Sequence, residues 1–92
     1  MTQADLGAVD AIATVVHPLH PESPAVPAER LALFPSGCFV AAGEDGAPLG
    51  YAVSHPWLVG RAPALDSLLG ALPAGADCLY LHDVALLPAA RG

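Results

Sequence analysis

The sequence predicts an α/β fold in the broad sense, an α+β mixture in which helices pack on a mixed, largely antiparallel sheet. Three observations predict it. Apolar residues recur at helical intervals over residues 3–16, two apolar segments flank a Gly-containing turn within residues 38–54, and residues 78–87 form the longest strand candidate. Because a direct hairpin pairs its strands antiparallel, the first strand pair has that orientation.

The N-terminal third is predicted to form two helices separated by a loop. Thr2 and Asp5 have the spacing of a capping box ahead of a helix over residues 3–16. Four prolines within residues 17–27 fix too many φ angles for a regular element, so we expect a loop there. A short second helix follows over residues 28–34.

The remainder is predicted to form three strands and a third helix. Residues 38–42 and 49–54 form a hairpin around the turn at residues 44–46. The leucines within residues 65–72 follow the spacing of one helical face, which predicts a short helix. Residues 78–87 form the last strand.

Composition limits the classes of function. The chain has 92 residues, 54% hydrophobic and only 13% charged, so we expect one small domain or part of one, with no internal boundary. A net charge of −6, with no lysine, argues against nucleic-acid binding. No apolar run reaches the roughly 18 residues of a membrane span, and the N-terminus lacks the cations of a signal peptide, so a cytoplasmic location is expected.

Three short segments show a resemblance to a known family. They are Ala4-Asp5-Leu6 with Ala8-Val9, then Gly50-Tyr51-Ala52-Val53, and finally Leu86-Leu87-Pro88-Ala89-Ala90-Arg91-Gly92. Together with the predicted order of elements they resemble the GNAT superfamily of acetyl-CoA-dependent N-acyltransferases. In that family a strand ending in an apolar residue and proline leads into the signature Arg/Gln-x-x-Gly-x-Gly/Ala, whose N–H groups at a helix N-terminus bind the acetyl-CoA pyrophosphate.

The resemblance implies an incomplete GNAT acyl-CoA N-acyltransferase fold, with residues 1–92 as a partial N-acetyltransferase domain. We expect elements of the family to be missing on both sides of it. The implied reaction is transfer of an acetyl group from acetyl-CoA, the acyl donor, to a primary amine of a small molecule or a peptide N-terminus. Because most of the phosphate-binding signature is absent, this chain is expected to bind acetyl-CoA weakly and to have little or no activity alone.

The resemblance also implies the cofactor-binding residues. The main chain of Val84, Ala85 and Leu86 would hydrogen-bond the acyl carbonyl and the pantetheine arm. Arg91 and Gly92 would be the first two positions of the phosphate-binding signature.

Four polar or aromatic residues are candidates for the acceptor side. Asp83 and His82 are candidates for a general base that takes a proton from an ammonium substrate, and strand alternation predicts that they lie on opposite faces. His55 and Trp57 follow the hairpin, where an imidazole beside an indole could bind a cationic or aromatic acceptor. The alternative for each is structural: polar groups that satisfy nearby backbone, and an indole packed in the core.

One further function class stays open, and a metal site is disfavoured. A non-catalytic interaction or oligomerisation module would bury exposed strand edges and apolar surface against another copy or a complementing chain. His17, His20 and Glu22 superficially suggest a metal site, but the prolines at 18 and 21 exclude helical His-x-x-His geometry. We therefore expect no metal and interpret these residues as solvated loop residues.

Overall fold

Two helices cover one face of a three-stranded sheet. The computed structural model describes residues 1–19 and 22–91. No helix in this described part of the chain is long and apolar enough to cross a membrane. The α+β mixture predicted from the sequence is confirmed. In chain order the elements are a 3-10 turn Gln3–Asp5, α1 Leu6–Val16, α2 Ala25–Leu33, a 3-10 turn Pro35–Gly37, β1 Cys38–Ala42, β2 Pro48–Trp57, β3 Cys78–Leu86 and a 3-10 turn Pro88–Ala90.

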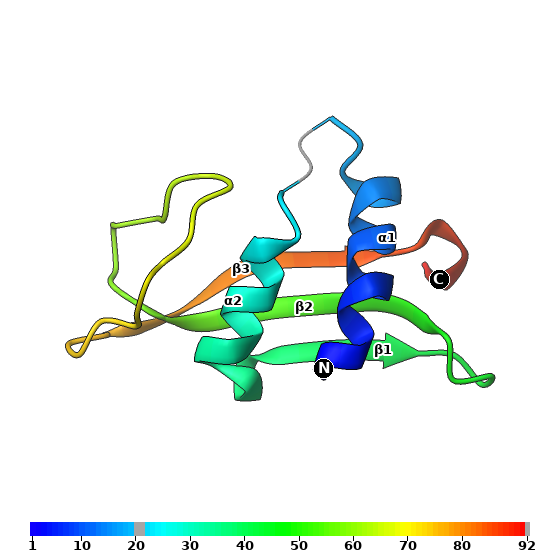
Figure 1. Ribbon diagram of the computed structural model, residues 1–92, viewed down its shortest axis with the longest axis horizontal. Helices are drawn as coiled ribbons and strands as arrows, with labels where there is room; N and C mark the ends of the chain where they lie inside the picture. The colour runs from blue at the N-terminus through cyan, green and yellow to red at the C-terminus, as the bar shows by residue number, and fades with distance from the viewer. Residues whose placement is uncertain (20–21, 92) are drawn as a thin grey trace.

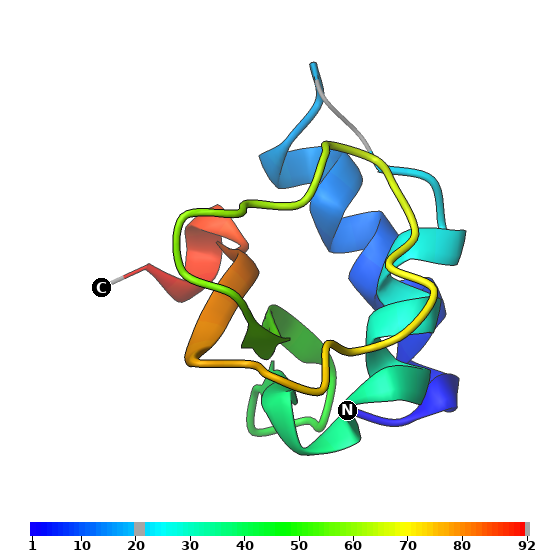
Figure 2. The same cartoon turned by 90° about the vertical axis from the view of Figure 1, so that its left-hand side faces the viewer.

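The three strands pair in sequence order, β1-β2-β3, and both pairs are antiparallel. Gly46 has a φ of +81° in the turn between β1 and β2, a backbone conformation that glycine adopts without steric cost. Both helices lie in front of the sheet in Figure 1, and the view along the strands in Figure 2 shows them on the same side of it. The pairing of β1 with β2 and of β2 with β3 confirms the predicted hairpin and last strand.

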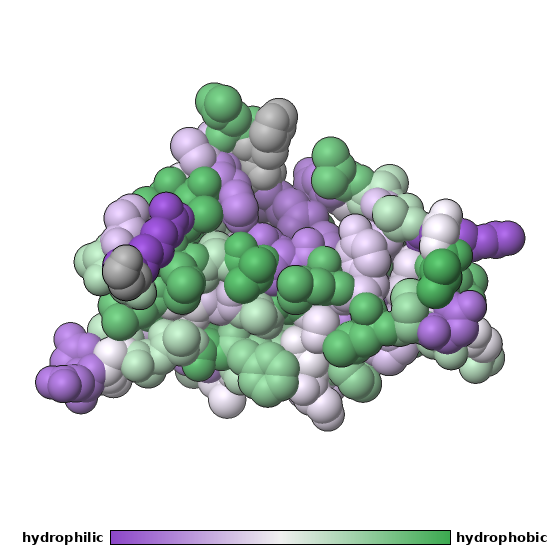
Figure 3. Space-filling model, turned by 180° about the vertical axis from the view of Figure 1, so that it is seen from behind, coloured by the Kyte–Doolittle hydropathy of each residue, from purple (hydrophilic) through white to green (hydrophobic). Residues whose placement is uncertain are grey.

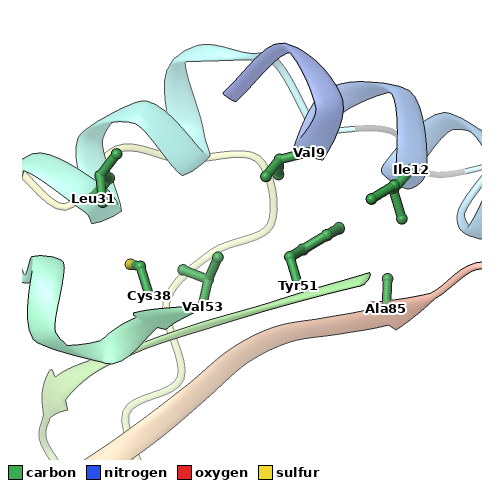
Figure 4. Packing of buried hydrophobic residues seen from close by; sticks show 7 residues of the cluster. All are labelled: Val9, Ile12, Leu31, Cys38, Tyr51, Val53 and Ala85. Atoms are coloured by element: carbon green, nitrogen blue, oxygen red, sulfur yellow. The ribbon is translucent and has the colours of Figure 1, made fainter. Parts of the chain in front are cut away.

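The hydrophobic core lies between the helices and the sheet. Val9 and Ile12 on α1, three residues apart, and Leu31 on α2 point toward the strands (Figure 4). Burial of these apolar side chains is the main favourable contribution to folding. The strands complete the cluster with Cys38, Tyr51, Val53 and Ala85.

The two predicted N-terminal helices are confirmed, with shifted boundaries. The Asp5 carboxylate accepts hydrogen bonds from the Thr2 N–H (2.7 Å) and the Thr2 hydroxyl (3.2 Å), as the capping-box spacing predicted. The first turn is 3-10, so α1 begins at Leu6. α2 begins at Ala25, three residues earlier than expected, because Pro27 fits within a first helical turn, where an N–H has no helical partner.

The predicted third helix is wrong. Residues 58–77 form a loop between β2 and β3. Asp66 has a φ of +51° and Gly70 a φ of +78°, both in the left-handed region that a right-handed helix excludes. Leu65 and Leu68 are 89% and 58% exposed, so the leucine pattern does not produce a buried helical face.

Two adjacent side chains of α2 fix this loop. Arg30 is completely buried and donates to Glu29 Oε1 (2.9 Å) and to the Ser67 carbonyl (3.1 Å). The Glu29 carboxylate accepts the backbone N–H groups of Leu69 (2.6 Å) and Gly70 (3.0 Å). These hydrogen bonds use the Ser67 carbonyl and the Leu69 and Gly70 N–H groups, which in a helix would bond to other groups of the same helix. The contacts with α2 therefore stabilise the loop conformation.

Loss of the Glu29 charge should destabilise the fold. Burial acts to raise the pKa of Glu29, but the two N–H donors and the adjacent guanidinium outweigh it and lower the pKa below 4.5. Glu29→Gln leaves the buried Arg30 without a counter-charge, so we expect unfolding to become easier by roughly 2 to 4 kcal/mol. Urea denaturation followed by circular dichroism measures the change. The exposed Glu44→Gln is the control, and equal stability of the two variants would contradict this account.

Candidate functional site

A cavity of about 410 Å³ lies between α1, the loop after it, and strands β2 and β3. This volume is within the range of small-molecule sites, about 300 to 1,000 Å³. Much of its wall is apolar, formed by Val9, Ala13, Val16, Pro18, Leu19, Pro27, Val53 and Leu65. The polar lining consists of Asp10, His17, Glu22, Tyr51, His82 and Asp83.

His82 and Asp83 both line the cavity, so the prediction of opposite faces is wrong. Val53 pairs with Asp83, but the next residue, Ser54, pairs with Leu81. β3 therefore has one extra residue at His82, a β-bulge, in which two residues of one strand oppose one residue of the other. The bulge interrupts the period of two and turns both polar side chains toward the helices.

Asp83 links two side chains from distant parts of the sequence. Its Oδ1 lies 3.0 Å from His17 Nε2, and its Oδ2 accepts a hydrogen bond from the Tyr51 hydroxyl at 2.5 Å. The hydrogen bond assigns the proton of a neutral His17 imidazole to Nε2 and leaves Nδ1 as the nitrogen that accepts a proton. Both oxygens of Asp83 are thus engaged, and the carboxylate orients an imidazole.

The Tyr51 hydroxyl is held in its protonated form. Burial raises its pKa above the ordinary value of 10, and the hydrogen bond and charge of Asp83 raise it further. The charges of Glu22 and Asp10 act in the same direction. Tyr51 therefore serves as a permanent donor to Asp83, and three carboxylates influence this one phenol.

A second imidazole and carboxylate form a similar pair. His82 Nε2 lies 2.7 Å from Glu22 Oε1, and the two side chains are 10% and 24% exposed. The other carboxylate oxygen, Glu22 Oε2, is buried and has no hydrogen-bond partner among the described residues. The cavity thus contains two imidazoles, each oriented by a carboxylate. Each can accept a proton in the same small space.

The lining is acidic. Asp10, Glu22 and Asp83 contribute carboxylates, and no arginine is among the described residues that line the cavity. A cavity lined by charges of one sign attracts a ligand of the opposite sign. A cationic ligand therefore suits this cavity better than an anion.

The predicted acceptor contacts His55 and Trp57 are not among the described lining residues. His55 is completely buried, with its ring edge-on to Trp57 at 5.3 Å between centroids and 5.5 Å from Tyr80. Trp57 Nε1 donates to the Arg61 carbonyl at 2.5 Å. The His82 ring, whose centroid is 6.3 Å from that of His55, lies between this aromatic cluster and the cavity, which His82 lines. Contact of His55 and Trp57 with an acceptor stays a prediction.

The main chain of β3 has an edge that no described strand covers. The Leu87 N–H donates to the Leu49 carbonyl at 2.8 Å, and inward-bonded residues alternate with outward-facing ones in an antiparallel pair. Main-chain groups of Ala85 therefore face β2, whereas those of Val84 and Leu86 face the open edge. Of the three residues implied to contact acetyl-CoA through their main chain, two are directed outward.

Arg91 folds back on this edge. Its Nε and Nη2 both donate to the Leu86 carbonyl, at 3.1 Å and 2.8 Å. Gly92, the other residue implied to contact phosphate, lies outside the described residues. A phosphate contact at Arg91 and Gly92 stays a prediction.

No group of three His, Cys, Asp or Glu side chains within residues 1–19 and 22–91 is arranged to bind a metal ion. His20, which the sequence placed near His17, lies outside this range. Both cysteines are free thiols, and burial raises the pKa of the Cys38 thiol, which disfavours its reactive thiolate form.

Sequence analysis missed four polar residues of the site, Asp10, His17, Glu22 and Tyr51. His17 and Glu22 were interpreted as solvated loop residues, but they lie against β3, 66 and 60 residues away from their partners. No local pattern indicates such long-range pairs. A usable signal existed for Tyr51, because alternation places it on the same strand face as the apolar Val53.

None of the protein-family models, curated proteins and solved structures compared with this chain matches it. The geometry of the cavity and of β3 is therefore the basis on which a function is proposed.

Acidification should destabilise the fold through His55. Burial lowers its pKa below 6.5, and the neighbouring Arg30 and His82 add to the shift. In the unfolded chain the His55 imidazole binds a proton near pH 6.5, whereas in the folded chain it binds this proton only at a lower pH. Stability therefore falls with pH in this window, by at most about 1.4 kcal/mol per pH unit.

Urea denaturation between about pH 7.5 and pH 5.5 measures this effect. We expect His55→Phe to have a shallower loss of stability with falling pH than the unaltered chain, whatever its absolute stability. Parallel pH profiles for the two proteins would contradict the assignment to His55.

Proposed function

We propose that this chain is the acceptor-binding part of an acetyl-CoA-dependent N-acyltransferase with an incomplete GNAT-type fold, located in the cytoplasm, and that the reaction transfers an acetyl group to a primary amine. The observation that supports it best is the cavity, in which two imidazole–carboxylate pairs lie beside a strand with an open edge. An acyl transfer to an amine requires a proton acceptor beside a place for the thioester.

The acceptor amine binds in the cavity. The carboxylates of Asp10, Glu22 and Asp83 favour an ammonium group. Glu22 Oε2, which has no hydrogen-bond partner within residues 1–19 and 22–91, suits one of its N–H donors. The apolar wall, which includes Val9 and Val53, suits the carbon chain of a small amine.

His17 acts as the general base, with Asp83 as the residue that positions it. Its side chain is 38% exposed, compared with 10% for His82, and Asp83 fixes its orientation. The imidazole takes a proton from the ammonium group, the freed amine attacks the thioester carbonyl, a C–N bond forms and the C–S bond breaks. On becoming an amide, the attacking nitrogen loses a second proton, which the departing thiolate takes up to leave as a thiol. The imidazolium releases the first proton to water, and this step regenerates the base.

The thioester lies along the open edge of β3. The outward main-chain groups of Val84 and the outward N–H of Leu86 suit hydrogen bonds with the acyl carbonyl and the pantetheine amides, whereas the Leu86 carbonyl already accepts from Arg91. Ala85 contributes packing, since its side chain is in the core. This part of the proposal is supported by the family resemblance and by the direction of these main-chain groups.

Two titrations of the ¹⁵N-labelled chain test the proposal. We expect n-butylamine to shift amide signals at the cavity, including His17 and Asp83, and acetyl-CoA to shift those of Val84 and Leu86. Acetyl-CoA binding should be weak, roughly in the millimolar range, because the Arg91 guanidinium already donates to the Leu86 carbonyl and would have to leave it to contact a phosphate. Acetyl-CoA shifts confined to other parts of the chain, or none at several millimolar, would contradict the acyltransferase proposal.

Asp83→Asn should weaken amine binding by roughly fivefold or more, because it removes a charge from the cavity. Glu44→Gln removes the same charge from an exposed turn and should leave amine binding unchanged. Equal losses in both variants would mean that net charge, and not the cavity, attracts the amine.

A further inference from the structure

The sheet face opposite the helices is apolar and uncovered among the described residues. Figure 3 shows this side of the molecule, with hydrophobic residues spread across it. Phe39 on β1 is 59% exposed, and on β3 Leu79 and Leu81 are 66% and 59% exposed. From the register of the strands, the face consists of Phe39, Ala41, Gly50, Ala52, Ser54, Pro56, Leu79, Leu81, Val84 and Leu86, none of which is charged. Ser54 is the one polar side chain among them, and it is 6% exposed and donates to the Gly37 carbonyl.

The large residues of β3 form a continuous ridge on this face. Leu79 and Leu81 are two positions apart, as are Val84 and Leu86, whereas Leu81 and Val84 are three positions apart, because the bulge at His82 lies between them. Without the extra residue, half of them would turn toward the helices. The ridge comprises Leu79, Leu81, Val84 and Leu86.

A hollow lies beside the ridge. It has a volume of about 240 Å³ and is bordered by Phe39 and Ala41 on β1, Ala52 on β2, and Val84 and Leu86 on β3. The hollow exists because β2 places a small side chain between larger ones on its neighbours. One face therefore presents both a row of projecting side chains and a depression.

We propose that this face docks a second copy of the chain, so that the ridge of each copy lies against the hollow of the other. A two-fold axis between two facing sheets makes each such contact twice, as in any symmetric dimer. Sheets that pack face to face interdigitate their side chains in the same way, about 10 Å apart. Tyr51 is the one described residue that borders both the cavity and the hollow, and its side chain lies in the core on the helix side of the sheet. This inference is therefore independent of the proposed function.

The absence of charge on this face suits a second copy better than a basic or acidic partner. The chain has a net charge of −6, and none of it lies on this face. A basic partner would gain no charge contact on the face itself. Two acidic copies can approach only across a surface free of charge, and this face is such a surface.

The size of the face limits the affinity. Strands of 5, 10 and 9 residues, at about 3.4 Å per residue and about 4.8 Å between strands, give a footprint of roughly 400 Å² per copy. A standard stable interface buries about 800 Å² per partner. We therefore expect a weak dimer with a dissociation constant in the high micromolar range.

Analytical ultracentrifugation from about 10 µM to 1 mM tests the proposal. The apparent mass should rise from 9.3 kDa toward twice that value. Leu81→Asp should remove the rise, whereas Leu68→Asp, at a leucine of matching exposure (58%) in the loop, should keep it. Circular dichroism confirms that each variant is folded. A monomer at 1 mM, or equal behaviour of the two variants, would overturn the proposal.

A second variant separates the specific fit from general stickiness. Ala41→Phe adds apolar surface at an exposed position but fills the hollow. We expect dimerisation to weaken by roughly tenfold or more, because the projecting side chains lose their place. Stronger association of this variant would mean nonspecific hydrophobic contact and would overturn the ridge-and-hollow arrangement.

Two further readouts identify the interface. In a mixture of ¹³C-labelled and unlabelled chains, intermolecular NOEs should join Leu81 methyl groups to Ala52. NOEs between the Val84 amides of two copies would instead indicate edge-to-edge pairing and would contradict the proposal.

Added NaCl should strengthen the dimer, since it screens repulsion between two acidic chains. Weakening by salt would point to charge-driven association and count against it.

Discussion

One extra residue in β3 determines how both faces of the sheet are used. The bulge at His82 places His82 and Asp83 together on the helix side, where they line the cavity. The same residue keeps Leu79 and Leu81 on the opposite face with Val84, and so leaves a continuous apolar surface. A regular strand could provide neither arrangement, because its side chains alternate strictly between the faces. The candidate site and the uncovered face therefore share one structural cause.

The cavity also depends on how the helices and loops are held. His17 lies directly after α1, at its C-cap, and reaches Asp83 because Val9 and Ile12 fix α1 on the sheet. The loop over residues 58–77 supplies Leu65 to the wall, and the Arg30 network fixes this loop. Core packing and a buried ion pair thus position groups that are remote from one another in the sequence. The positions of the few side chains that could carry out chemistry are therefore set by packing across the whole fold.

Local patterns predicted most of the fold but little of the site. The helix after Thr2, the hairpin and the last strand follow from the periods of their apolar residues and from flanking prolines and glycine, which act over a few residues. The leucines at positions 65–72 have a helical period too, yet the Glu29 carboxylate takes the main-chain N–H groups of Leu69 and Gly70. Asp83 and His82 were predicted, but His17 and Glu22 were not, because a tertiary contact has no local period.

NOE spectroscopy of the two cavity histidines is the most direct test of this account. The bulge predicts contacts from the His82 ring to Glu22, and from the His17 ring to Tyr51 and to the Hβ protons of Asp83, in one folded state. A regular strand would instead place the His82 ring on the open face, with contacts to Ala52 and Ser54. That second pattern would contradict the central claim that one extra residue brings His82 and Asp83 to the same face.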